Sequence, residues 1–88
     1  MITYKKACTI AGNVRDKECP SCKHAHVVDI KDRWAFTFSV YAPNDARYMT
    51  PAPSFFIFKE DGRVEWFSIP PLENLDLIES GHAVKFIQ

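Results

Sequence analysis

The sequence lacks any hydrophobic run long enough to cross a membrane. The longest uninterrupted apolar run, Phe55–Phe58, is far shorter than the roughly 20 apolar residues that a membrane-spanning helix needs. The residues that follow Lys5 and Lys6 are too polar, and the apolar stretch is too short, for the hydrophobic region of a signal peptide. We therefore expect a cytoplasmic protein with no membrane partner.

The sequence also lacks an excess of charge of either sign. Eleven lysine and arginine residues balance eleven aspartate and glutamate residues, and the basic residues form no dense run. A chain of this kind offers no basic surface for gripping a nucleic-acid backbone or an anionic membrane. We expect no nucleic-acid partner.

Internal repeats and low-complexity segments are absent as well, which excludes a repeat protein or a disordered chain. The 88 residues are 47% hydrophobic, a balance typical of globular domains. A chain of this length buries somewhat more than about 60% of its unfolded surface, so its core is small. Residues 1–88 are expected to form a single domain.

Cysteine is scarce, and its number is informative. The three cysteines cannot all pair with one another, which argues against a disulfide-rich secreted scaffold. Cys19 and Cys22 are separated by two residues, a spacing that serves either to hold a metal ion or to open and close as a disulfide. Either use would organise the remaining residues around this pair.

The first third of the chain is predicted to form a strand, a loop and a helix. Residues 1–10 carry β-branched and aromatic side chains typical of a strand, and residues 11–18 are polar with Gly12 and Asn13, as in a loop. Pro20 suits the first position of a helix, with Cys19 as its N-cap. Residues 21–33 are ambiguous: their apolar residues fit a broad helical stripe, but Val28 and Ile30 alone also fit strand alternation. Length favours the helix.

The remaining chain contains clearer strand signals. In Trp34–Tyr41, large residues alternate with small ones, which predicts an interior strand. Residues 42–53 contain three prolines and predict a connection, with one helical turn at residues 45–49. Two β-rich runs at 54–60 and 63–69, joined by Asp61-Gly62, predict an antiparallel hairpin. Pro70-Pro71 is expected to start a helix that ends at Gly81, with Leu72, Leu75 and Ile78 on one face; Val84, Phe86 and Ile87 in the tail are expected to pack on the body.

These motifs together resemble the thioredoxin superfamily. The resemblance rests on Cys19-Pro20-Ser21-Cys22 at the expected start of a helix, on the proline-led strand Ala52-Pro53-Ser54 and on the Asp61-Gly62 hairpin. In size and element order the chain looks most like the small glutaredoxins, including those of bacteriophages. The resemblance implies an α+β fold, an α/β/α sandwich in which a mixed sheet of about four strands has helices on both faces, so that residues 1–88 would be a single thioredoxin-like domain.

The resemblance also implies a function, that of a dithiol–disulfide oxidoreductase. Cys19 would attack a protein disulfide as a thiolate, Cys22 would resolve the mixed disulfide, and Pro53, in the cis form, would face the pair. Pro20, Ser21 and Ala52 would contact the substrate. A helix N-terminus, with Lys17 and Lys23 nearby, would hold the pKa of the Cys19 thiol below that of a free thiol.

The partners implied by this resemblance follow from that activity. Electrons would come from glutathione or a thioredoxin reductase and would pass to a protein disulfide, with ribonucleotide reductase as a typical recipient in the resembling phage proteins. The redox-active disulfide would need no further cofactor, and the protein is expected to be a monomer.

A zinc site is the main alternative. Cys8, Cys19 and Cys22 with His26 or His24 could supply three sulfurs and one nitrogen to zinc, in a small interaction or regulatory module without enzymatic activity. A thioredoxin-like fold used only for binding is a third possibility. On its own, Cys8 is expected to be a semi-buried strand residue, and His24 and His26 to be solvated residues of a helix. Tyr41 and Tyr48 could line a substrate groove.

Overall fold

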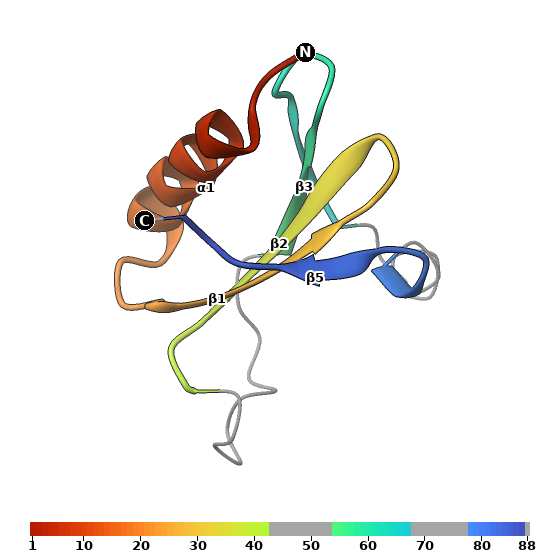
Figure 1. Cartoon of the computed structure of the whole chain (residues 1–88). Helices are drawn as coiled ribbons and strands as arrows, with labels where there is room; N and C mark the ends of the chain where they lie inside the picture. Colours follow the sequence, from red (N-terminus) through yellow and green to blue (C-terminus); the bar gives the residue numbers. More distant parts are fainter. Residues whose placement is uncertain (43–53, 68–77, 88) are drawn as a thin grey trace.

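The protein folds as an α+β domain in which one helix lies against an antiparallel sheet (Figure 1). This computed structural model describes residues 1–42, 54–67 and 78–87. Their elements in chain order are α1 (Tyr4–Glu18), β1 (His24–Asp29), β2 (Arg33–Ser39), β3 (Ser54–Phe58), β4 (Val64–Trp66) and β5 (His82–Val84). The strands lie in the order β4-β3-β2-β1-β5, and every neighbouring pair is antiparallel.

The α+β class predicted from the sequence is confirmed, whereas the sheet differs from the prediction. Instead of about four strands in a mixed sheet, the described residues form five strands without a parallel pair. The order of elements around the CxxC motif also differs, because a helix precedes the motif and a strand follows it. A thioredoxin-like fold is therefore not confirmed.

Helix α1 replaces the strand predicted for residues 1–10 and the loop predicted for residues 11–18, so both predictions are wrong. Thr3 is its N-cap, and the Thr3 hydroxyl accepts a hydrogen bond from the Lys6 backbone nitrogen at 3.1 Å. The buried face of the helix consists of Ala7, Cys8 and Ala11. Because these side chains are small, the apolar periodicity that would identify the helix is weak in the sequence. The same small side chains let the helix pack close to the sheet.

Strand β1 replaces the helix predicted for residues 21–33, so this prediction is also wrong. Val27 packs toward α1, and the next residue, Val28, packs in a separate cluster on the opposite face of the sheet. The alternative strand alternation at Val28 and Ile30 agrees with the structure, because these two side chains pack in the same cluster, whereas Val27 packs in the other cluster with α1.

Strand β2 confirms the predicted interior strand, since it lies between β1 and β3. Its large side chains Trp34, Phe36 and Phe38 form the core beneath α1, while the small Ala35 lies on the other face. Phe36 also packs against Phe55 of β3, with ring centroids 5.9 Å apart. The core thus lies mainly between α1 and the sheet.

The predicted hairpin is confirmed. Strands β3 and β4 pair in an antiparallel manner, although β4 is shorter than the predicted strand. Gly62 adopts a φ of +76°, the left-handed conformation that the Asp61-Gly62 pair predicts. The Asp61 carboxylate accepts a hydrogen bond from the Arg63 backbone nitrogen at 2.9 Å, which closes the turn.

The chain after the hairpin is described only in part. Residues 43–53 of the predicted connection, with the helical turn predicted at 45–49, and most of the helix predicted after Pro70-Pro71 lie outside the described residues. Ile78, at the end of that predicted helix, packs against the cluster on the face opposite α1. Val84 and Phe86 pack against the main core as expected, whereas Ile87, which was expected to pack as well, is 44% exposed. Strand β5 was not predicted.

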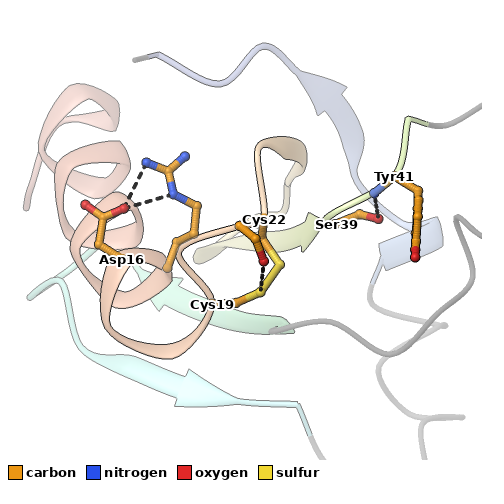
Figure 2. The surroundings of a disulfide bond; sticks show 7 residues. Asp16, Cys19, Cys22, Ser39 and Tyr41 are labelled. Carbon is orange, nitrogen blue, oxygen red and sulfur yellow. Dashed lines mark hydrogen bonds and ion pairs between the residues drawn. A yellow bond between two sulfur atoms is a disulfide. The ribbon is translucent and has the colours of Figure 1, made fainter.

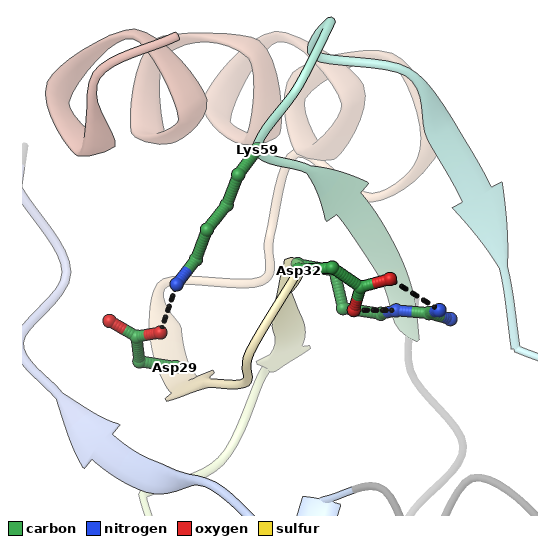
Figure 3. A network of polar contacts seen from close by, with 4 residues as sticks. Asp29, Asp32 and Lys59 are labelled. Carbon is green, nitrogen blue, oxygen red and sulfur yellow. Dashed lines mark hydrogen bonds and ion pairs between the residues drawn. The ribbon is translucent and has the colours of Figure 1, made fainter. Parts of the chain in front are cut away.

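A polar network joins the turn after β1 to the turn after β3, and Figure 3 shows its ion pairs Lys59–Asp29 and Arg33–Asp32. Lys59 Nζ lies 2.6 Å from Asp29 Oδ1 and 5.3 Å from the centre of the Trp34 ring. The Lys59 backbone nitrogen donates to the Asp32 carbonyl oxygen, and the Lys59 carbonyl oxygen accepts from the Ile2 nitrogen. These bonds fix the position from which α1 starts.

Candidate functional site

Cys19 and Cys22 are joined by a disulfide bond in the turn that connects α1 to β1 (Figure 2). Their Cα atoms are 5.5 Å apart, and the Cys22 backbone nitrogen donates to the Cys19 carbonyl oxygen at 3.0 Å. The turn brings the two sulfurs together because α1 ends at Glu18 and the chain reverses toward β1. The pairing considered from the sequence spacing is therefore present in the structure.

The turn lies at the carboxyl end of a helix, so the predicted N-cap role of Cys19 is wrong. Cys19 is the C-cap of α1, and its backbone nitrogen donates to the Arg15 carbonyl oxygen at 2.7 Å. Pro20 is exposed and follows the helix instead of starting one, which is a common place for proline. The negative end of the α1 dipole lies here, so the predicted stabilisation of a Cys19 thiolate by a helix N-terminus is absent.

The two cysteines differ in their exposure to solvent. Cys22 is only 1% exposed and belongs to the main core, whereas Cys19 is half-buried at the edge of that core. Ser21 between them is exposed, and its hydroxyl oxygen lies 3.7 Å from the Cys19 sulfur. Cys19 is therefore the more accessible of the two residues to a reagent that approaches from solvent.

Charged residues flank the turn on both sides. Lys17 and Lys23 are exposed, and they supply positive charge beside the pair as expected. Arg15, one turn of helix before Cys19, donates from Nε and Nη2 to Asp16 Oδ1, both at 3.3 Å (Figure 2). Sequence reasoning missed Arg15 and Asp16 because residues 11–18 were interpreted as a loop; a helical spacing of four residues from Arg15 to Cys19 is the signal that would have found them.

The ligand set of the zinc alternative is not brought together. Cys8 is buried on α1, not on a strand, and it lies in the core beneath the helix. His24 and His26 are exposed residues of β1, not of a helix, and strand alternation directs them to the face opposite Val27 and α1. Among the residues that the structure describes, no group of three or more His, Cys, Asp or Glu side chains could hold a metal ion.

The other predicted site residues are placed only in part. Ala52, Pro53 and Tyr48 lie outside the described residues. Tyr41 is half-buried just beyond β2, where its backbone nitrogen donates to the Ser39 hydroxyl at 3.1 Å (Figure 2). Ser39 pairs with His24 in the sheet, so the end of β2 lies beside the start of β1, two residues after Cys22.

Comparisons with protein-family models, curated protein sequences and solved structures find no match to this chain. Within the described part of the chain, α1 included, no helix is both long enough and apolar enough to cross a membrane.

Proposed function

We propose that this protein is a thiol–disulfide exchange protein that reduces disulfides of other proteins through the Cys19–Cys22 pair. The observation that carries the proposal is the asymmetry of the pair. Its two sulfurs lie within bonding distance in a turn between two elements, with one half-buried at the surface and the other in the core. Thiol–disulfide exchange needs an accessible attacking sulfur and a protected partner within reach of it.

The reaction follows from these positions. In the reduced protein, the Cys19 thiolate attacks one sulfur of a substrate disulfide, and the displaced substrate thiolate takes up a proton. Cys22, after losing its proton, then attacks the Cys19 sulfur of the mixed disulfide and releases the second substrate thiol. The substrate gains two electrons and two protons, and the Cys19–Cys22 disulfide forms.

A second reaction must return the pair to its dithiol state. A thiol reductant such as glutathione, or a dithiol supplied by a thioredoxin reductase, would attack the more exposed Cys19 sulfur and expel the Cys22 thiolate, which takes up a proton. A second glutathione, or the second thiol of the dithiol, would then attack the reductant sulfur of this mixed disulfide. Cys19 leaves as a thiolate, and the reductant ends as its own disulfide. A cytoplasm, where such reductants keep thiols reduced, is the compartment that suits this direction of electron flow.

Membership of the thioredoxin superfamily remains a separate proposal. Of the motifs that carry the resemblance, the CxxC and the Asp61-Gly62 hairpin lie among the described residues, and Pro53 does not. The exchange chemistry requires only the two sulfurs. Because α1 presents its carboxyl end to Cys19, the helix dipole does not stabilise the thiolate, and the charges of Lys17 and Lys23 must provide what electrostatic help there is.

Reduction of insulin by dithiothreitol tests the proposal. We expect the protein to accelerate the reaction, Cys19→Ser to abolish the acceleration, and Cys8→Ser to retain it as the matched control. An unaccelerated reaction with the correctly folded protein would contradict the proposal. Stoichiometric zinc in the purified protein, with unfolding on chelation, would contradict it in favour of the interaction module.

A further inference from the structure

A second site lies along α1, between the helix and the C-terminal segment. A cavity of about 270 Å³ opens there. The C-terminal segment runs from β5 back to α1 and forms one wall of it (Figure 1). The cavity is lined by helix residues and by two residues of the C-terminal segment: Cys8, Thr9, Gly12, Asn13, Arg15, Asp16, Phe86 and Ile87.

Gly12 creates the hollow in the helix surface. Glycine within a helix costs about 1 kcal/mol relative to alanine, so its presence in the middle of α1 needs a reason. Close packing is not that reason, because a Cβ atom at Gly12 would meet nothing nearer than Arg15 Nη2 at 4.0 Å. The missing side chain instead leaves open space in the floor of the cavity.

Arg15 supplies the positive charge of this cavity. Its guanidinium carbon lies 5.5 Å from the centre of the Phe38 ring and 6.0 Å from that of Phe86, so two aromatic rings orient the group. Both of its hydrogen bonds go to a single oxygen of Asp16 at 3.3 Å, longer than the roughly 2.7–2.9 Å of a strong charge-assisted bond. Within the described residues, Nη1 of Arg15 has no acceptor.

We propose that this cavity binds a small organic carboxylate that carries an apolar tail. The carboxylate would accept two parallel hydrogen bonds from Arg15, a geometry for which a guanidinium is well suited. Phe86 and Ile87 would contact the tail. The Asp16 side chain is 66% exposed, so it can turn to solvent when a ligand replaces it.

The charges of the cavity favour a carboxylate over a phosphate. Arg15 is the one basic residue of the lining, and Asp16 beside it is acidic. A dianionic phosphate would meet more repulsion from Asp16 and would leave one of its charges unpaired. Neither of the neighbouring polar side chains adds charge: the Thr9 hydroxyl donates to the Lys5 carbonyl oxygen, and Asn13 is an amide. This site does not depend on the redox proposal.

Titration with hexanoate, followed by the backbone amide signals in NMR spectra, tests the site. We expect saturable shifts around Gly12 and Phe86, with a Kd on the order of millimolar for so small a ligand. Hexanamide, which has the same tail without the charge, should bind about tenfold more weakly, and Arg15→Gln should weaken hexanoate binding by a similar factor.

Two variants at Gly12 distinguish a loss of binding caused by filling the cavity from one caused by unfolding. Gly12→Leu should fill the hollow and abolish binding, whereas the smaller Gly12→Ala should retain it, with circular dichroism confirming that both variants fold. Shifts that do not saturate, or equal binding of hexanoate and hexanamide, would overturn the proposal. If Gly12→Leu does not fold, unchanged hexanoate binding by Arg15→Gln would still overturn it.

Discussion

The backbone nitrogen of Cys19 donates to the Arg15 carbonyl oxygen at 2.7 Å, so the outer sulfur of the disulfide belongs to the last residue that α1 holds in place. The other sulfur, that of Cys22, is in the core. The disulfide therefore connects the end of the helix to the packed interior, and its reduction should affect both.

Reduction of the Cys19–Cys22 bond should weaken the fold only modestly. A disulfide that closes so short a loop constrains the unfolded chain by about 2 kcal/mol in the chain-entropy description. We expect dithiothreitol to lower the free energy of unfolding by at most about that amount, as measured by urea denaturation. Complete unfolding on reduction would show that the bond is a structural requirement and would contradict a reversible redox role.

The two cysteines should respond differently to substitution in the reduced protein. Cys22→Ser places a hydroxyl in the apolar core and should cost about 1–3 kcal/mol, whereas Cys19→Ser, at the edge, should cost less than about 1 kcal/mol. Urea denaturation of both variants in the presence of reductant measures the difference. Equal losses in the free energy of unfolding would contradict the difference in burial between Cys19 and Cys22.

The ion pair between Lys59 and Asp29 should contribute more than the exposed pair between Arg33 and Asp32. The first pair is partly buried and spans two turns, with side-chain exposures of 21% and 29%, while Asp32 is 58% exposed. We expect Asp29→Asn to cost about 1–2 kcal/mol and Asp32→Asn less than about 0.5 kcal/mol. The comparison of the two variants in chemical denaturation checks the ranking, and similar costs would refute it.

Stability should fall in alkaline solution through Tyr4. Burial, followed by contact with Cys8, raises the pKa of the Tyr4 hydroxyl well above its usual value, and that hydroxyl donates to the Lys85 carbonyl oxygen at 2.8 Å. The folded state therefore keeps a proton that the unfolded chain loses near pH 10, so this contribution is complete below that pH and declines above it.

Denaturation curves measured across this alkaline range, for the native protein and for Tyr4→Phe, isolate the effect from lysine titration. The native protein should lose more stability than the variant as the pH rises. Parallel declines would show that Tyr4 is not responsible.

Gly81→Ala should be among the most destabilising single-methyl additions in this chain. A Cβ atom at Gly81 would collide with the Asp29 carbonyl oxygen and would lie 2.7 Å from Val28 Cγ1, because β5 approaches β1 closely there. We expect a cost of about 1–3 kcal/mol, whereas Gly12→Ala in the open part of α1 should stabilise the protein by up to about 1 kcal/mol. Thermal unfolding of the two variants measures this difference. A Gly81→Ala variant more stable than Gly12→Ala would contradict the prediction.

The parts of the fold that were predicted correctly are those with strong local signals. Large residues alternate with small ones from Trp34 onward, and the Asp61-Gly62 turn is specific to a hairpin, so neither needed information from the rest of the chain. Strand β5 is three residues long, and its pairing with β1 depends on contacts distant in sequence. No local sequence pattern therefore predicts strand β5.

The structural setting of the Cys19–Cys22 pair differs from the one predicted, because the pair follows a helix and does not begin one. The spacing of Cys19 and Cys22 allowed either a metal site or a disulfide, and the structure joins the two sulfurs. Pro20 did not decide the setting, because proline is common both in the first turn of a helix and just after the end of one. The start of α1 was mistaken for a strand for two reasons. Its buried face consists of small side chains, and the β-branched Thr9 and Ile10 beside that face are typical of a strand. The position of the helix could be decided only by packing on the sheet.

Trapping of a mixed disulfide tests the redox proposal most directly. Reduced Cys22→Ser should attack a dimer of two disulfide-linked peptides through Cys19 and release one peptide as a thiol. The other peptide should stay covalently attached, because the resolving thiol is missing, and mass spectrometry would then find it linked at Cys19. Cys19→Ser, whose remaining thiols Cys8 and Cys22 are both buried, should form the adduct much more slowly. An adduct that forms equally fast on Cys19→Ser, or on neither variant, would contradict the account.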